Sequence, residues 1–252
     1  AGATHRFGTQ VRGGGVGVTC WGSGEDFVGA GLDNGIVRFW RTDGTAAAPV
    51  FERSVQKDDS EASPAAVIGL CAGGGSESLT RVLACDGKGS IHAWKWSEHL
   101  SAEGTEDEDA AASSFSTGGA VSVAAFDEAG ARCVVGGRDR DFGLWDVNST
   151  TCTFRARNVP KDNLDLPVPV WVSGLRFVPE QPNQIIASTG FVQFRLRGEV
   201  RLYDIALGKR RPVIRSIAPL GEEAIRAIAC TPDGRYVVAG SGSGGLGRVG
   251  PR

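Results

Sequence analysis

The sequence predicts an all-β fold built from a repeated unit, and three observations support this. Short strands of alternating apolar and polar residues end on an aromatic residue. Each of these strands is preceded by a turn rich in Gly or Asp, and each turn is preceded by a small apolar strand. The four aromatic-ended segments are LDNGIVRFW (32–40), CDGKGSIHAW (85–94), RDRDFGLWD (138–146) and RGEVRLYD (197–204).

A repeated strand–turn–strand unit that ends in Trp or Trp-Asp is typical of the blades of a WD40-type β-propeller. The intervals between Trp40, Trp94, Trp145 and Tyr203 are 54, 51 and 58 residues. A WD unit is about 40–45 residues long, so each interval carries about ten extra residues, which we expect in loops. We predict that these four aromatic residues occupy equivalent positions in the third strand of successive four-stranded blades.

The strand pattern divides the chain into blade-like units of one incomplete propeller domain over residues 1–252. The units are 16–55, 66–118, 120–158, 170–217 and a half unit, 224–252, in which the apolar strand at 235–244 has no aromatic partner. Strand alternation places the turns between second and third strands, and the connections between blades, at one end of the strands. Turns between third and fourth strands emerge at the other end.

The charge of the chain is unevenly distributed. Residues 1–130 carry 9 Lys and Arg against 18 Asp and Glu, and residues 131–252 carry 18 against 11. Part of the acidic charge is EGTEDED (103–109), inside a Ser- and Ala-rich stretch, 97–116, which is either a solvated disordered insertion or a docking tail for a basic partner. The basic half suits a phosphate backbone or an acidic protein surface.

Metal and cofactor chemistry find no support in the sequence. The six cysteines form no CxxC pair and there are three histidines, so we expect free thiols in the strands of an intracellular protein rather than a zinc site. Residues 240–245 match GxGxxG, but a dinucleotide site needs a helix after that loop and only LGRVGPR follows.

Catalytic arrangements are also missing from the sequence. It contains no Ser-His-Asp, paired-carboxylate or Walker pattern, and we expect no enzyme. Asp146 and Asp204 end two of the aromatic strands. They lie a blade apart, and we expect each to accept hydrogen bonds within its own turn rather than to act as a catalytic acid.

A connection between two predicted blades carries a more specific pattern. It reads FRARNV (154–159), DNLDL (162–166) and VPVW (168–171), and a TG turn, VRLYD (200–204) and KRRPV (209–213) follow. In these motifs the chain resembles the WD repeat-containing protein 74 family, from about residue 20 to residue 213. The resemblance implies a non-enzymatic nucleolar or nuclear factor that joins pre-60S particles, contacts other assembly factors and is released by a nucleolar AAA-type ATPase.

The chain also departs from this family. Members carry seven blades, whereas this chain corresponds to about four and a half, from the second blade through half of the sixth. VQFRLR (192–197) lengthens the hairpin before VRLYD, and the sequence has no methionine and ends in GLGRVGPR. We therefore expect a fragment or an imperfect gene model.

The blade-to-blade linker is the candidate partner-binding site. Its residues are Arg155, Arg157, Asn158, Lys161, Asp162 and Asp165. The arginines can bind a carboxylate or phosphate with two hydrogen bonds. Leu164 and Leu166 are expected to pack the loop against the blades. The alternative is an ordered connection held by its own polar side chains.

A secondary basic cluster consists of Lys209, Arg210 and Arg211, which strand alternation places near the opposite face from the linker. Arg195, Arg197 and Arg201 share the linker's end of the blade, where contact with pre-rRNA is an alternative to protein binding. Two functions of different class follow: a scaffold of 60S subunit assembly and pre-rRNA processing, or a generic WD40 adaptor such as a ubiquitin-ligase substrate receptor or signalling scaffold.

Overall fold

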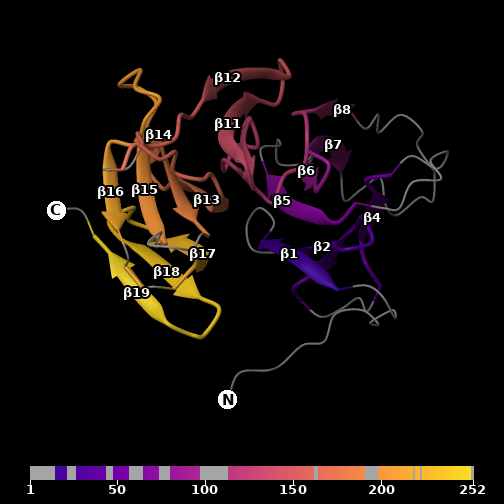
Figure 1. Cartoon of the computed structure of the whole chain (residues 1–252). Helices are drawn as coiled ribbons and strands as arrows, with labels where there is room; N and C mark the ends of the chain where they lie inside the picture. Colours follow the sequence, from indigo (N-terminus) through magenta and orange to yellow (C-terminus); the bar gives the residue numbers. More distant parts are fainter. Residues whose placement is uncertain are drawn as a thin grey trace. The chain divides into compact units, whose positions relative to one another are not determined.

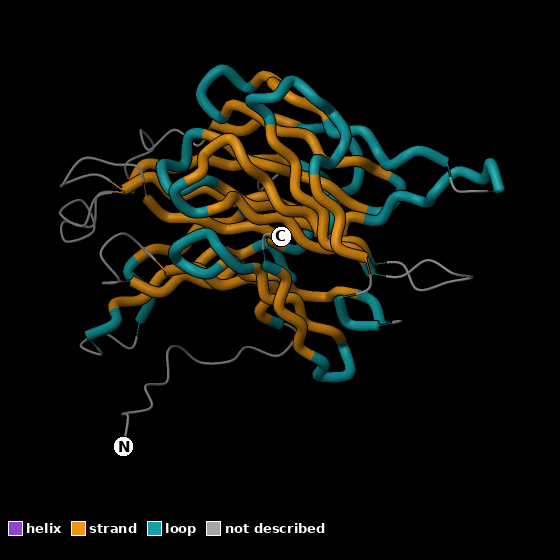
Figure 2. Tube along the Cα trace, turned by 90° about the vertical axis from the view of Figure 1, so that its left-hand side faces the viewer, coloured by secondary structure: helices purple, strands orange, loops and turns teal. Residues whose placement is uncertain are grey.

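Nineteen β-strands make up the regular structure of the described part of the chain, and no helix occurs there (Figures 1 and 2). The computed structural model describes residues 15–21, 27–43, 48–56, 65–73, 80–96, 113–161, 164–190, 198–217, 219–221 and 223–250. The all-β prediction is confirmed.

Five antiparallel sheets follow one another along the chain, and each joins its strands in sequence order. The first contains β1 (Val16–Trp21), β2 (Phe27–Leu32), β3 (Ile36–Arg41) and β4 (Phe51–Ser54). The second contains β5 (Val67–Gly73), β6 (Thr80–Asp86), β7 (Ser90–Trp96) and β8 (Ser113–Ser116). Strand β8 corrects part of the disordered-insertion alternative for residues 97–116, because residues 113–116 pair with β7. Residues 97–112, with the acidic segment 103–109, lie outside the described residues.

The remaining sheets lie in the second half of the chain. The third contains β9 (Val123–Phe126), β10 (Arg132–Gly137), β11 (Arg140–Asp146) and β12 (Thr151–Arg155). The fourth contains β13 (Val172–Val178), β14 (Gln181–Thr189), β15 (Glu199–Asp204) and β16 (Ile214–Ile217). The fifth has three strands, β17 (Ile225–Cys230), β18 (Val237–Ser241) and β19 (Leu246–Val249).

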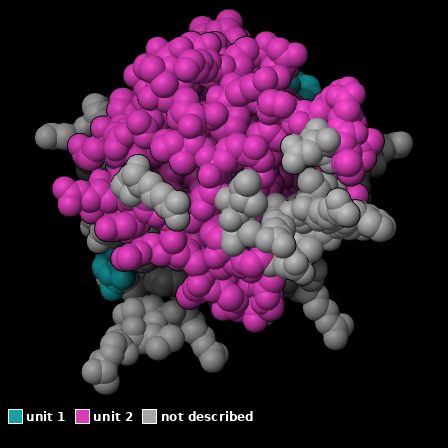
Figure 3. Space-filling view, turned by 60° about the vertical axis from the view of Figure 1, so that its left-hand side comes forward, with its two compact units in different colours: residues 1–120, 128–131 teal, residues 121–127, 132–252 magenta. Residues whose placement is uncertain are grey.

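The five sheets fall into two compact units (Figure 3). Unit 1 comprises residues 1–120 and 128–131, with the first two sheets, and unit 2 comprises residues 121–127 and 132–252, with the other three. That all five sheets belong to one propeller domain stays a prediction.

The four aromatic residues occupy equivalent positions in the third strands, as predicted. Trp40 pairs with Val28, Trp94 with Val82, Trp145 with Cys133 and Tyr203 with Ile185. Each partner lies four residues before the last residue of the second strand of its sheet. All four aromatic side chains are buried.

Neighbouring sheets within a unit share an apolar core, as adjacent propeller blades do. In unit 1 the ring of Phe51 on β4 meets the edge of Trp94 on β7, with centroids 6.2 Å apart. In unit 2 Phe142 on β11 meets Tyr203 on β15 at 4.8 Å. The first strands also lie side by side: β1 contacts β5, and β13 contacts both β9 and β17.

The strand-end aspartates accept hydrogen bonds in their own turns, as expected. Oδ1 of Asp146 accepts from the backbone N–H groups of Asn148, at 2.9 Å, and Ser149, at 2.7 Å. Oδ1 of Asp204 accepts from the N–H of Ala206 at 3.0 Å. These bonds fix the turns between third and fourth strands.

The Gly-rich segment 240–245 forms a hairpin turn between β18 and β19. Gly244 has φ +94°, a conformation that L side chains rarely adopt, and its N–H bonds to the carbonyl of Ser241. The pairing of β19 with β18 requires only backbone groups, so a third strand forms although it lacks the aromatic residue of the other blades.

Candidate functional site

The linker between β12 and β13 leaves its sheet early. Strand β12 ends at Arg155, which pairs with Gly143 in the middle of β11, and the N–H of Ala156 still bonds to the carbonyl of Phe142. Ala156 and Val159 are both buried. The linker therefore begins alongside the sheet rather than beyond the ends of its strands.

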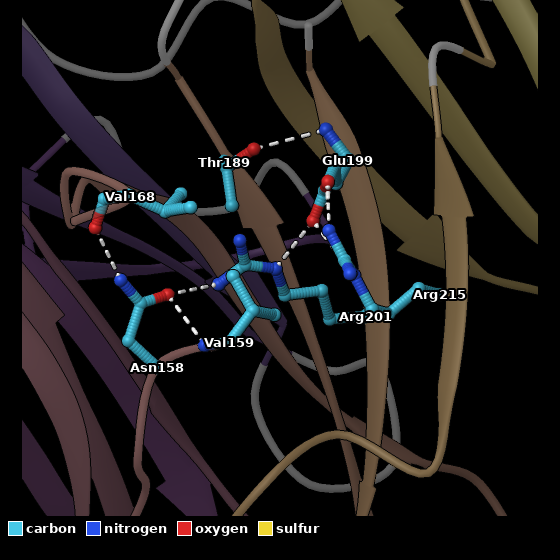
Figure 4. A network of polar contacts seen from close by, with 7 residues as sticks. All are labelled: Asn158, Val159, Val168, Thr189, Glu199, Arg201 and Arg215. Atoms are coloured by element: carbon cyan, nitrogen blue, oxygen red, sulfur yellow. Dashed lines mark hydrogen bonds and ion pairs between the residues drawn. The ribbon is translucent and has the colours of Figure 1, made fainter. Parts of the chain in front are cut away.

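The side chain of Asn158 forms hydrogen bonds with residues near both ends of the linker (Figure 4). Its Nδ2 donates to the carbonyl of Val168 at 2.5 Å, which closes the intervening residues into a loop. Its Oδ1 accepts from the N–H of Val159 and from Nη1 of Arg201, both at 2.9 Å, and its own N–H donates to Oδ2 of Asp141 at 3.0 Å. The Asn158 side chain is thus occupied by contacts within the chain.

An ion-pair network on β15 and β16, with Glu199 and Arg201 buried and Arg215 exposed, supports Asn158. Nε of Arg201 donates to Oε2 of Glu199 at 2.7 Å, and Nε and Nη2 of Arg215 donate to the two oxygens of the same carboxylate. The N–H of Glu199 donates to Oγ1 of Thr189 at 2.9 Å. Figure 4 shows Arg201 lying between Glu199 and Asn158, so this residue joins the linker to the neighbouring sheet.

The network determines how its carboxylates titrate. Burial alone would raise the pKa of Glu199, but the hydrogen bonds and charges of Arg215 and Arg201 outweigh burial and lower that pKa below its ordinary value. For Asp141, burial outweighs the hydrogen bond from Asn158 and the charges of Arg201 and Arg210, so its pKa is raised.

Sequence reasoning missed the structural role of this network. It grouped Arg201 with the surface cations, yet Arg201 is 5% exposed and cannot meet a partner from its buried position. The sequence did contain a signal: Glu199 and Arg201 are two residues apart in a strand, so their side chains share a face. Arg195 and Arg197 lie outside the described residues.

The remaining linker cations are exposed to solvent. Arg155 lies over the Trp145 ring, with its guanidinium carbon 5.9 Å from the ring centroid. Arg157 is exposed, and Lys161 pairs with Asp165 at 3.1 Å. Asp162 lies outside the described residues. The structure thus places Arg155, Arg157, Lys161 and Asp165 at the surface, where their binding role stays a prediction.

Leu164 and Leu166 do not pack against the blades. They are 65% and 56% exposed, so that expectation was wrong. The bond from Asn158 to Val168 closes the loop at its base, and these two leucines therefore lie on the part that projects from the sheet.

The secondary basic cluster lies beside the linker, and its predicted position near the opposite face was wrong. Nε of Arg210 donates to the carbonyl of Arg155 at 2.7 Å, and the N–H of Arg157 donates to the carbonyl of Arg210 at 2.8 Å. The reason is geometric. The linker starts partway along its sheet, and the connection from Ile205 to Val213 between β15 and β16 reaches across to it.

The two clusters form one basic surface, which we call the docking surface. Its exposed cations are Arg155, Arg157, Lys161, Lys209, Arg210 and Arg211. Arg210 differs from the other five because its guanidinium group also donates a hydrogen bond to the Arg155 carbonyl. A groove of about 720 Å³ lies within this surface.

Comparison with known proteins gives relatives for less than half of the chain. WD repeat-containing protein 74 of Bos taurus is 38% identical over 115 residues, which are 45% of this chain and 28% of that protein. The Homo sapiens protein of the same name is 36% identical over the same shares. The chain resembles the WD repeat-containing protein 74 family, as its motifs predict.

A second name appears among the relatives. Ribosome biogenesis protein NSA1 of Yarrowia lipolytica is 33% identical over 87 residues, which are 31% of this chain and 20% of that protein. No family model matches the chain. In each of these comparisons the chain matches less than a third of the relative's own length.

The described residues contain no group of three or more His, Cys, Asp or Glu residues placed to hold a metal ion. No helix among them is long and apolar enough to cross a membrane. All six cysteines lie among the described residues and none forms a disulfide; two are buried and four half-buried, and burial raises the pKa of Cys20 and of Cys133 to about 12.

Proposed function

We propose that this chain belongs to a non-enzymatic scaffold of large (60S) ribosomal subunit biogenesis and pre-rRNA processing. It binds partner proteins through the docking surface. The observation that carries the proposal is the similarity to relatives named WD repeat-containing protein 74 and ribosome biogenesis protein NSA1. Names of this kind describe a repeat architecture and a process rather than a catalysed reaction.

The geometry of the docking surface supports a binding role. Asn158 and Arg201 hold the linker by hydrogen bonds within unit 2, while the cations of Arg155 and Arg157 remain exposed. A surface that is ordered before its partner arrives loses less conformational entropy on binding. The buried network thus supplies rigidity, and the exposed cations supply attraction for a negatively charged partner.

The proposed partners are assembly factors of pre-60S particles in the nucleolus or nucleus. Release by a nucleolar AAA-type ATPase is part of the proposal, and so is the absence of a small-molecule substrate. Contact with pre-rRNA is the alternative mode of attachment to the particle.

Affinity purification of the tagged protein tests the proposal. We expect large-subunit precursor rRNA and assembly factors to co-purify, and depletion of the protein to lower the amount of mature large-subunit rRNA relative to small-subunit rRNA. Co-purification of ubiquitin-ligase or signalling subunits without precursor rRNA would instead support the generic adaptor function and contradict the proposal.

A further inference from the structure

The groove in the docking surface has two kinds of wall. It runs between the linker and the connection from β15 to β16, entirely within unit 2. Cationic side chains line one part of it, and aliphatic side chains and a proline line the rest. The lining residues are Arg157, Leu207, Lys209, Arg210, Arg211, Pro212 and Val213.

Backbone hydrogen bonds shape this groove before any partner binds. The reciprocal contacts of Arg210 with Arg155 and Arg157 hold the connection against the linker. A tight turn lies within this connection, because the N–H of Gly208, at φ +64°, donates to the carbonyl of Ile205 at 3.0 Å. Val213 is tied to β15 by a bond from its N–H to the carbonyl of Leu202.

Three of the four groove cations form no ion pair within the described part of the chain. Within the residues that the structure describes, no carboxylate pairs with Arg157, Lys209 or Arg211, and all three are exposed. Asp141 is near enough to interact with Arg210, but it already accepts a hydrogen bond from Asn158. Among the described residues, these three groove cations thus form no ion pair.

Aliphatic side chains stand exposed next to this charge. Leu207 is 57% exposed, Val213 36% and Ile214 48%, and all three belong to the connection or to the first residue of β16. Leu207 and Val213 both line the groove, so it has an apolar part next to its cations. Clustered cations around an apolar cleft match a ligand that alternates acidic and aliphatic groups.

We propose that this groove binds an acidic peptide segment of a partner protein, with a bulky aliphatic side chain seated among its carboxylates. The carboxylates meet Arg157, Lys209 and Arg211, and the aliphatic side chain packs on Leu207 and Val213. Single-stranded RNA fits less well, because none of the described residues that line the groove has an aromatic ring to stack a base.

This inference rests on the proposed scaffold function and adds the chemistry of the partner. Its test needs no ribosomal particle, so the two can fail separately. The probe is a fluorescein-labelled synthetic peptide with one leucine flanked on each side by three acidic residues. Fluorescence anisotropy with the 252-residue chain measures its affinity. We expect saturable binding that weakens as salt concentration rises.

Matched probes and variants separate the two walls of the groove. The triple variant R157E/K209E/R211E should bind the probe at least about tenfold more weakly, while R235E, a charge reversal at an exposed turn that does not line the groove, should bind it normally. A probe with serine in place of leucine should bind the wild-type chain more weakly than the leucine probe does. The Leu207→Ser variant should likewise bind the leucine probe more weakly than the wild-type chain does. Circular dichroism checks that each variant keeps its strand content.

Three results would overturn the inference. They are unchanged binding by the folded triple variant, equal affinity for the leucine and serine probes, and binding of oligouridylate in preference to the peptide. The last result would make the groove a phosphate-backbone site.

Discussion

The guanidinium group of Arg210 donates a hydrogen bond to the backbone carbonyl of Arg155, 55 residues earlier in the chain, at 2.7 Å. This bond joins the linker after β12 to the connection between β15 and β16. It turns two basic clusters into one docking surface, and it assigns Arg210 a structural role within that surface. Experiments on binding should therefore leave Arg210 unchanged.

The buried ion pair of Arg201 and Glu199 should contribute more to stability than the outer pair of Glu199 and Arg215. The Arg201 side chain is 6% exposed and also bonds to Asn158, whereas the Arg215 side chain is 37% exposed. We expect Arg201→Ala to lower the free energy of unfolding by roughly 3 kcal/mol and Arg215→Ala by about 1 kcal/mol. Urea unfolding of the two variants measures the difference, and equal losses would contradict the assigned network.

Asn158 should control the order of the linker. Asn158→Ala removes the hydrogen bonds to Val168 and Arg201, and should cost about 1–2 kcal/mol and speed amide hydrogen exchange between residues 156 and 170. Asn183→Ala is the matched control, because Asn183 is exposed and its recorded bond uses its backbone carbonyl. Unchanged exchange in the Asn158 variant would show that other contacts order the linker.

Glu199 should make stability depend on acidic pH. Since Arg215 and Arg201 hold its pKa in the folded protein below the ordinary value of 4.5, its stabilising contribution is complete above about pH 4.5. That contribution is lost as pH falls through the lowered pKa of the folded state. The melting temperature of the wild type should therefore exceed that of Glu199→Gln near neutral pH, and the gap should narrow below pH 4.5. A gap that stays constant down to pH 3 would mean that Glu199 does not titrate as described.

The strand order and the aromatic positions could be predicted from the sequence because they depend on local patterns. Alternation and turn chemistry place Trp40 and Trp94 at the same register in their sheets. The position of the Lys209–Arg211 cluster could not be predicted in this way. It depends on where β12 ends and on how the connection from Ile205 to Val213 folds, and neither has a periodic signal.

Arg201 shows a related limit. Residue type alone cannot separate a surface arginine from one that a carboxylate and an amide hold inside the protein, because both environments satisfy its donors. The separation required the position of Asn158, which lies 43 residues away in the sequence. The docking surface is accordingly defined by arginines and lysines that the fold leaves exposed.

Co-sedimentation with pre-60S particles tests the central claim most directly. The triple variant R155E/R157E/K209E reverses three exposed charges of the docking surface, and the control R53E/K88E/R235E reverses three exposed charges elsewhere. Exposed charge changes usually alter stability by within about ±0.5 kcal/mol per site, so both variants should fold. On a sucrose gradient the control should sediment with pre-60S particles, and the docking-surface variant should remain at the top with a near-normal melting temperature. Normal co-sedimentation of the folded docking-surface variant would contradict the claim that these cations attach the protein to its particle.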